Sequence, residues 1–422
     1  MTNHQLKIDA AIESIKDEII SFIQALVQSP SLANDEGPVQ NIIFDKLNQL
    51  GLTTEKVSVH FVSIKNHPAF CDDGFSPDTR TNVIGNWNNG QGRSLILNGH
   101  VDVVPTGSET LWDESPWSGL VKDGRIYGRG SCDMKAGLAS AIFAIQILQS
   151  LGIKPNGNVM VQSVVGEESG GCGTLTNIVK GYHGDGVVIL EPTSLKMSPI
   201  QSGALTFRLT IPGRATHAAM RWDGVSAIEK YNIVHQSILE LEKHRHHSFE
   251  SQYYESPSRV APINIGTIKG GGWHSTVPES VIAEGRLGVF PSETAQDARD
   301  AFENHIRKIS NEDKWLKDNP PVIEWFEGQF ESGQTAVDHP LIQTLKNSFV
   351  QSVGDAPILE GVSYGSDLRL FTNHAQIPAV LFGPGDVRLA HAANEFVEIE
   401  EVLACINIIA NMIVNWCGGS VE

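Results

Sequence analysis

The chain has 422 residues, 41% of them hydrophobic, so it is long enough to bury a large core and to form two or three structural units. Its formal net charge is −18, which argues against nucleic acid or an anionic membrane as a partner, because both attract basic patches. We therefore expect a globular protein whose acidic surface keeps it in solution.

The N-terminal stretch, residues 1–30, alternates apolar and charged residues at helical spacing. It contains no long apolar core, so it predicts helix and neither a signal peptide nor a membrane span. We therefore expect a cytoplasmic protein without a membrane partner.

The next part of the chain alternates short apolar strands with an apolar-periodic helix. The predicted strands cover residues 81–87, 94–100, 158–166 and 184–192, and the predicted helix covers 135–152. Such a pattern indicates an α/β sheet with helices on its faces. Glycine, proline and acidic residues cluster directly after each strand.

From about Gln201 the pattern changes to strand, helix, strand, strand, helix, strand. The strands are expected at residues 204–213, 262–271, 280–290 and 321–328, and the helices at 226–244 and 295–310. This βαββαβ order is a ferredoxin-like unit and a natural insertion. The earlier style returns with a helix at 339–353, a strand at 377–385 and a closing helix from Glu398. We therefore predict a mixed-sheet α/β domain in two parts, 1–200 and 331–422, interrupted by an inserted domain, 201–330.

The five cysteines are scattered and show no CxxC spacing. They are Cys71, Cys132, Cys172, Cys405 and Cys417. An odd number without paired spacing predicts reduced thiols rather than a disulfide framework or a thiolate zinc site. Any metal would therefore need nitrogen and oxygen ligands.

One strand raises a question about chemistry, because "LILNGHVDVVP" ends on His100 and Asp102. Side chains two residues apart on a strand point the same way, and open α/β sheets keep their sites at the carboxyl ends of the strands. The pair therefore has the form of a ligand and its orienting partner. The alternative is a histidine that caps the strand beside a surface aspartate, since these would give the same sequence pattern without a functional role.

Four further motifs place an acid or a histidine where a buried run meets a loop. They are "YGRGSCDMKAG", "VVGEESGGCG", "VVILEPTS" and "GPGDVRLAHAANEFV", which carry Asp133, Glu167, Glu168, Glu191 and His391. Each residue alone has an ordinary explanation, since an acid at a helix start is usually a cap and paired glutamates are usually solvated. The repetition along the chain favours a shared site.

These residue types suit a pair of divalent ions. Two ions about 3.5–4 Å apart need a bridging carboxylate and further histidine and carboxylate ligands, and they lower the pKa of a water between them. One more carboxylate must stay off the metals to move the proton of that water to the leaving group. The adjacent Glu167 and Glu168 offer one group of each kind, and Asp102 can orient the ring of His100.

Together these motifs resemble those of the di-zinc peptidases and deacylases, a family that includes acetylornithine deacetylase, succinyl-diaminopimelate desuccinylase, aminoacylase 1 and the glutamate-releasing carboxypeptidases. The resemblance covers nearly the full chain, in the order of the motifs and in the position of the inserted unit. It implies a di-zinc hydrolase whose inserted domain serves dimerisation or covers the site. Two Zn²⁺ ions per subunit are implied, and Co²⁺ or Mn²⁺ would suit the same ligands.

The resemblance also assigns roles. It makes Asp133 the bridging ligand, His100 and Glu191 the partners on one zinc, and Glu168 and His391 those on the other. Glu167 becomes the general base and Asp102 the residue behind His100. A cis peptide bond from Asp133 to Met134 is implied as well. Glutamate at position 191, where aminopeptidases of the family have aspartate, favours a deacylase or a carboxypeptidase.

A second group of residues gains a role only from the resemblance. It implies that His217 stabilises an oxyanion, that Asn264 and Arg286 bind a substrate carboxylate, and that the histidine and the asparagine come from the partner subunit of a homodimer. "GVSYGSDLRLF" adds Arg369 as a candidate near the substrate tail. Without the family these are ordinary structural residues.

Two stretches have no assigned function. The segment between Val59 and Thr81 is longer and more polar than a strand connection needs, and we expect a loop over the mouth of the site. The histidines at the end of the helix at 226–244, His244, His246 and His247, are expected on a solvated face rather than on a metal.

The resulting hypothesis is a hydrolase that removes an N-acyl group from an amino acid or a related amine. A dipeptidase or carboxypeptidase using the same site is the alternative, since both reactions break an amide. A third possibility is a binding or scaffold protein with a vestigial metal site, but every family position that these motifs cover is filled. The expected partners are small N-acyl amino acids or short peptides and a second copy of the chain.

Overall fold

The computed structural model describes residues 3–72, 74 and 80–421. The helices are α1 (Asn3–Ser14), α2 (Lys16–Val27), α3 (Gly37–Gln49), α4 (Phe61–Ile64), α5 (Ala136–Ser150), α6 (Cys172–Val179), α7 (Ala227–His247), α8 (Ala295–Glu312), α9 (Pro340–Val353) and α10 (Ile399–Cys417). The longer strands are β1 (Thr53–Ser58), β2 (Thr81–Trp87), β3 (Gly92–His100), β7 (Gly157–Val164), β9 (Met197–Gln201), β10 (Gly203–Pro212), β11 (Ile263–Gly270), β12 (Ser280–Val289) and β13 (Val322–Phe330). The shorter strands are β4 (Leu120–Lys122), β5 (Arg125–Tyr127), β6 (Ile153–Pro155), β8 (Val187–Ile189), β14 (Gly333–Gln334), β15 (Leu359–Val362), β16 (Ala379–Leu381), β17 (Phe396–Glu398) and β18 (Gly419–Val421).

The chain forms two compact units. The large unit comprises Met1–Pro199, Gln334–Glu360 and Ser366–Glu422, and the inserted unit comprises Ile200–Gly333 with the short return Gly361–Gly365. Each unit has its own sheet and its own core, and each is described by itself.

The large unit is built on a nine-stranded mixed sheet. Its main path runs β1-β2-β7-β3-β8-β16-β9-β14, and β15 pairs with β9. The four neighbours β7, β3, β8 and β16 are parallel, whereas β2 and β9 join them antiparallel on either side. The carboxyl ends of the four parallel strands therefore meet at one edge of the sheet, where an open α/β sheet holds its ligands.

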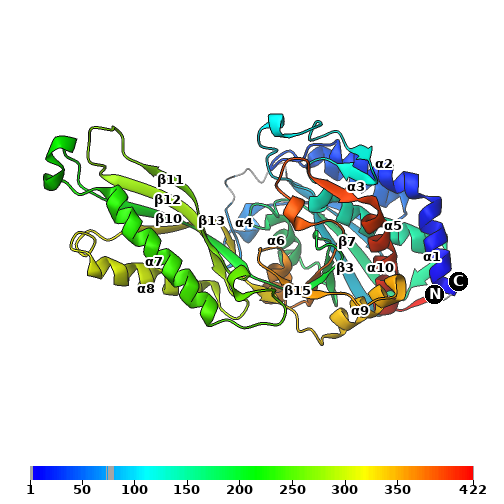
Figure 1. The fold of residues 1–422 in the computed structure, drawn as a ribbon. Helices are drawn as coiled ribbons and strands as arrows, with labels where there is room; N and C mark the ends of the chain where they lie inside the picture. The colour runs from blue at the N-terminus through cyan, green and yellow to red at the C-terminus, as the bar shows by residue number, and fades with distance from the viewer. Residues whose placement is uncertain (1–2, 73, 75–79, 422) are drawn as a thin grey trace. The chain divides into compact units, whose positions relative to one another are not determined.

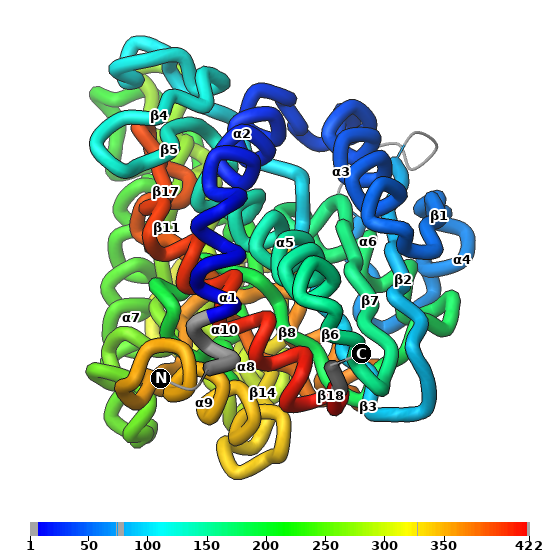
Figure 2. The backbone as a smooth tube through the Cα atoms, turned by 90° about the vertical axis from the view of Figure 1, so that its right-hand side faces the viewer, coloured from blue at the N-terminus to red at the C-terminus, as the bar shows by residue number. Residues whose placement is uncertain are grey.

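Two apolar helices pack side by side against the middle of this sheet. Figures 1 and 2 show α5 and α10 next to each other over β3 and β7, with α1 outside them. Among the described residues, the segments Ser131–Ser150 and Ile399–Cys417 are long and apolar enough to cross a membrane by length and composition. Both segments are mostly buried inside the structure, as in core helices, which are apolar nearly all round.

The inserted unit is a four-stranded antiparallel sheet in the order β11-β12-β10-β13, with α7 and α8 packed against it (Figure 1). Along β10 buried and half-buried residues alternate after Leu205, which gives the sheet one face toward the helices. The rings of Phe207 on β10 and Phe302 on α8 lie 4.7 Å apart in this core. The unit therefore has the βαββαβ order of a ferredoxin-like fold.

The fold class expected from the sequence, a mixed-sheet α/β unit with a ferredoxin-like insertion, is confirmed. Some details differ. The N-terminal helix is interrupted at Ile15, and a small sheet of β4, β5 and β17 was not foreseen. The expectation of a solvated histidine run was wrong for His246, which is 9% exposed with its ring against Phe290. His244 and His247 are exposed.

Candidate metal centre

The strand ends of the large unit bring the predicted ligands to one place. His100 is the last residue of β3, Glu167 and Glu168 follow β7, and Glu191 follows β8. Asp133 lies in a distorted turn, Ser131–Lys135, directly before α5. The remaining candidate is His391, in the loop before β17.

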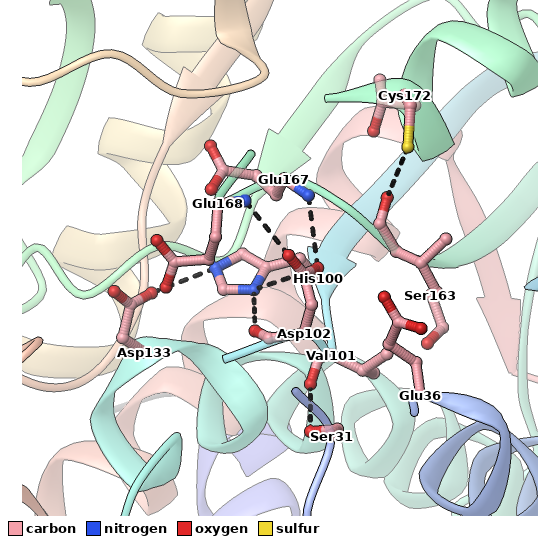
Figure 3. Close-up of polar contacts among 12 residues, drawn as sticks. Ser31, Glu36, His100, Val101, Asp102, Asp133, Ser163, Glu167, Glu168 and Cys172 are labelled. Atoms are coloured by element: carbon pink, nitrogen blue, oxygen red, sulfur yellow. Dashed lines mark hydrogen bonds and ion pairs between the residues drawn. The ribbon is translucent and has the colours of Figure 1, made fainter. Parts of the chain in front are cut away.

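Asp133 lies between two imidazoles. Its Oδ1 is 3.1 Å from Nε2 of His100, and its Oδ2 is 3.5 Å from Nε2 of His391. The same nitrogen of His391 is 3.0 Å from Oε2 of Glu168. Figure 3 shows the ring of His100 between Asp133 and Asp102. One carboxylate with an oxygen toward each histidine is the arrangement that a bridging ligand requires.

Among the described residues, two trios of side chains come close enough to hold an ion. They are His100 with Asp133 and Glu168, and His100 with Glu167 and Glu191. Within each trio the possible ligand atoms all lie within 4.8 Å of one another. The second trio contains Glu167, the residue that the family resemblance makes the general base, so this carboxylate also lies close enough to bind an ion.

Asp102 acts at two points, only one of which was foreseen. Nδ1 of His100 is 2.8 Å from the backbone oxygen of Asp102, whereas the nearest carboxylate oxygen is 3.8 Å away. The carboxylate instead accepts hydrogen bonds from the backbone N–H groups of Glu167, at 3.2 Å, and Glu168, at 3.1 Å (Figure 3). The buried Asp102 thus orients the ring through its carbonyl and holds the glutamate pair through its side chain.

Negative charge is concentrated in this site. Burial and then the charge of Asp133 raise the pKa of Glu191 to about 8. Burial and then the charge of Glu191 raise the pKa of Glu167 well above its usual range, and burial and then Asp133 raise the pKa of Glu168. Hydrogen bonds with Asp133 and Glu168 raise the pKa of His391 to about 10.

The pKa of Asp133 moves the other way. Burial acts to raise it, but the hydrogen bonds with His100 and His391 outweigh burial and hold the pKa below its usual range. Four acids and two imidazoles crowded together would be relieved by divalent cations, which bind the deprotonated forms. The donor set of nitrogen and oxygen atoms therefore fits a pair of metal ions, with zinc, cobalt and manganese all compatible with it.

Two charged residues behind Asp133 were not singled out from the sequence, although both lie within the quoted motifs. Glu395 accepts hydrogen bonds from the backbone N–H groups of Cys132 and Asp133, and it pairs with Arg129. The peptide bond from Asp133 to Met134 is cis, as the resemblance implied.

The candidates in the inserted unit lie on its surface. Asn264 on β11 and Arg286 on β12 face each other directly in the strand register, and both are exposed. His217 is also exposed, and its Nδ1 accepts a hydrogen bond from the N–H of Ala219 at 3.1 Å. Their predicted roles remain predictions.

Arg369 is fully buried in the large unit. Its Nη2 donates a hydrogen bond to the carbonyl of Gly170 at 2.9 Å, in the loop that follows Glu168. The buried guanidinium of Arg369 therefore supports the loop that follows Glu168. Contact with the substrate tail remains a prediction for Arg369.

The long segment between Val59 and Thr81 runs beside the same loop. A Cβ atom on Gly170 would lie 2.6 Å from Cβ of Cys71, so the two backbones pack closely there. At the end of the segment the buried Arg80 pairs with Glu36 at 2.8 Å. Residues 73 and 75–79 lie outside the described residues, and a role over the mouth of the site remains a prediction.

A comparison with protein-family models decides the family. The model of peptidase family M20/M25/M40 matches residues 96–415, which include every candidate ligand and the whole inserted unit. The chain belongs to this family. Members of peptidase family M20 are metal-dependent hydrolases of amide bonds, and this chain is therefore a metal-dependent amide hydrolase.

Individual relatives differ in their substrates. The chain is 29% identical to N-formyl-4-amino-5-aminomethyl-2-methylpyrimidine deformylase of Bacillus subtilis, over 97% of each chain. Its fold is similar to that of a metallo-carboxypeptidase of the M20 family from Sulfolobus solfataricus, with a TM-score of 0.75 and 17% identity over 95% of this chain and 99% of the other. A dinuclear metal-binding M20 peptidase of Bacillus subtilis superimposes with a TM-score of 0.63 and 16% identity over 95% of this chain and 98% of that protein.

Proposed function

We propose that this M20-family hydrolase removes an acyl group from the nitrogen of a small amine or amino acid. The observation that carries the proposal is the grouping of His100, Asp133, Glu168 and His391 beside two further buried carboxylates, Glu167 and Glu191. The similarity to a deformylase over the full length of both chains supports a deacylase.

Two zinc ions would be held by five residues: Asp133 would be shared between them, His100 and Glu191 would hold one, and Glu168 and His391 would hold the other. The similar fold of a dinuclear metal-binding peptidase supports two ions. Bound metals would polarise the amide carbonyl and lower the pKa of the attacking water.

Glu167 then serves as the general base. Its carboxylate takes the proton of the attacking water and delivers it to the leaving nitrogen, so that the amine departs neutral. Asp102 supports this role because its carboxylate holds the backbone N–H of Glu167 at 3.2 Å. Burial keeps the base out of bulk water, where a carboxylate would be too weak a base for the reaction.

The alternative is a dipeptidase or carboxypeptidase, favoured by the shared fold with a metallo-carboxypeptidase. A substrate panel separates the two. It contains N-formyl, N-acetyl and N-succinyl amino acids, an N-formylated aminomethylpyrimidine and a set of dipeptides, each with and without a chelator. We expect chelator-sensitive release of the acyl group and little dipeptide cleavage. Absence of chelator-sensitive hydrolysis of any substrate would contradict the proposal.

The proposed enzyme is a cytoplasmic homodimer that pairs through the inserted unit. β11 is an edge strand of the sheet, and exposed apolar side chains lie on and near it: Ile268 is 53% exposed and Trp273 is 65% exposed. An edge strand with apolar neighbours is prone to pair with a second copy. His217 and Asn264 would then act in the site of the partner subunit, with Arg286 beside Asn264.

A mixed dimer tests this arrangement. One subunit lacks Glu167 and the other lacks His217, so each homodimer is nearly inactive. If His217 acts across the dimer, the heterodimer has one doubly damaged site and one intact site, and about half of the wild-type activity returns. Heterodimers that form without regaining activity would place His217 elsewhere.

A further inference from the structure

A buried ion pair joins Arg129, which follows β5, to Glu395, which precedes β17. Nη1 of Arg129 is 2.6 Å from Oε2 of Glu395, and the two side chains are 2% and 1% exposed. The cost of desolvating both charges offsets much of their attraction, so a buried pair contributes little stability by itself. The contacts of the two groups indicate what else the pair does.

The carboxylate of Glu395 holds the backbone that carries Asp133. Its Oε1 accepts hydrogen bonds from the N–H groups of Cys132, at 2.9 Å, and Asp133, at 3.1 Å. Hydrogen bonds to an ionised acceptor are stronger than neutral ones, and two of them on consecutive residues fix the direction of the chain. Glu395 therefore holds in place the backbone from which the side chain of Asp133 projects.

The guanidinium of Arg129 contacts two other loops of the site. Nη1 donates to the carbonyl of Ala392 at 3.2 Å, directly after His391. Nη2 donates to the carbonyl of Pro105 at 3.3 Å, three residues after Asp102. The centre of the guanidinium lies 5.3 Å from the ring centre of Trp112, which adds a contact with its face. Because the guanidinium is a rigid planar fork, these contacts fix the two loops relative to each other.

We propose that Arg129 and Glu395 are positioning residues that set the spacing of the metal ligands before any ion binds. The pair joins the backbone segments that carry His100, Asp133 and His391, although none of its own atoms would touch a metal. This inference rests on the proposed function, because it takes these three residues as ligands. Residues that support ligands from behind typically change metal affinity by about 10–100-fold when they are replaced.

Two variants test the pair. Glu395→Gln keeps the shape of the side chain but sets an amide NH₂ against the donors of Arg129. Arg129→Lys keeps the charge beside Glu395, but a single ammonium cannot reach the carbonyls of both Pro105 and Ala392.

The inserted unit offers a matched control. Arg245 pairs with Glu293 at 2.7 Å and donates a hydrogen bond to the carbonyl of Gly288 at 3.0 Å. Glu293 in turn accepts a hydrogen bond from the N–H of Phe290 at 2.9 Å. Glu293→Gln and Arg245→Lys thus remove the same kinds of contact from a backbone that carries no candidate ligand.

The readouts are Zn²⁺ affinity, from competition with a chromophoric chelator, and the visible absorption of the Co²⁺-loaded protein, with folding checked by circular dichroism. We expect Glu395→Gln and Arg129→Lys to bind Zn²⁺ about 10–100-fold more weakly and to give an altered Co²⁺ spectrum. The two control variants should match the wild type in both. If Glu395→Gln fails to fold, Arg129→Lys decides.

Three outcomes overturn the inference. Folded variants with wild-type affinity and a wild-type Co²⁺ spectrum would show that the pair does not position the ligands, while the proposed function stands. If the two control variants lost as much Zn²⁺ affinity, general destabilisation of the protein would explain the loss. A wild-type protein that binds neither Zn²⁺ nor Co²⁺ would overturn the proposed function and this inference together.

Discussion

The strand ends of the large unit and the sheet surface of the inserted unit carry candidate residues in opposite ways. At the strand ends the side chains are mostly buried, and His100 and Asp102 each make two hydrogen bonds there. On the inserted sheet Asn264 and Arg286 are exposed on neighbouring strands. A buried polar group must be matched inside the fold, so the first site is organised by the chain itself. A functional role for the exposed residues of the second surface therefore depends on a molecule that binds over them.

Metal removal should affect only the first of these regions, and it has the largest expected effect. Dialysis against a chelator should abolish hydrolysis and lower the stability of the large unit, by about 2.7 kcal/mol for each ion lost relative to protein with free metal at a hundred times its Kd. Hydrogen exchange should show faster exchange at Cys132 and Asp133 and unchanged exchange in β10 and β12. Equal loosening of both sheets would contradict the distinction between the two regions.

Glu167→Gln should lower kcat by about 10²–10⁴-fold, because it removes the general base and keeps the shape of the side chain. Metal content, measured by atomic emission, should stay at the wild-type value. Glu168→Gln is the comparison, because loss of a ligand should lower metal content as well as kcat. Wild-type turnover in Glu167→Gln would show that another group moves the proton.

His217→Ala tests the exposed region. If the imidazole stabilises an oxyanion, its loss should cost about 2.7–4 kcal/mol of transition-state stabilisation, measured from kcat/KM. Since His217 lies outside the buried network, Zn²⁺ affinity and thermal stability should not change. Loss of metal together with activity would show that the two regions are not separate.

The smallest expected effect is a pH dependence of metal binding. Below about pH 8 the carboxyl of Glu191 keeps its proton in the metal-free protein, because its pKa is raised to about 8. Coordination requires the carboxylate, so each proton released should strengthen the apparent affinity by roughly tenfold per pH unit as pH rises toward 8. Calorimetric titrations in buffers of different ionisation enthalpy would count these protons. Affinity independent of pH between 6 and 8 would contradict the assignment of Glu191 as a ligand.

The raised pKa of Glu191 also predicts how the stability of the metal-free protein depends on pH. The pKa of Glu191 is raised on folding, so the folded state binds more protons than the unfolded state between about pH 4.5 and 8. The stability that this group contributes is therefore present at low pH and is lost as pH rises through 8. Urea unfolding of the metal-free protein at pH 5 and pH 8 should show the decrease, and Glu191→Gln should remove its share of it.

The sequence could predict the strand ends, because each apolar run stops at a charged residue and parallel strands end at the same edge of a sheet. The sequence could not predict the hydrogen bonds that hold the backbone of these strand ends in place. Glu395 reaches Cys132 across 263 positions of the chain, and the carboxylate of Asp102 turns to the backbone of Glu167 rather than to His100. Such bonds from side chain to backbone depend on tertiary structure and leave no spacing pattern.

Short elements were missed for a related reason. β14, with two residues, and β15, with four, are held by the neighbouring β9 rather than by their own sequence preference. The burial of His246 likewise follows from its contact with Phe290. Phe290 lies outside this helix, so the charge pattern of the helix alone does not reveal this contact.

We propose that five residues bind two ions while Glu167 binds neither. Anomalous scattering from a crystal of the zinc-loaded protein tests it most directly. Two peaks are expected on either side of Asp133, one beside His100 and Glu191 and the other beside Glu168 and His391. A single peak held by His100, Glu167 and Glu191, the second trio that the structure brings within 4.8 Å, would contradict it.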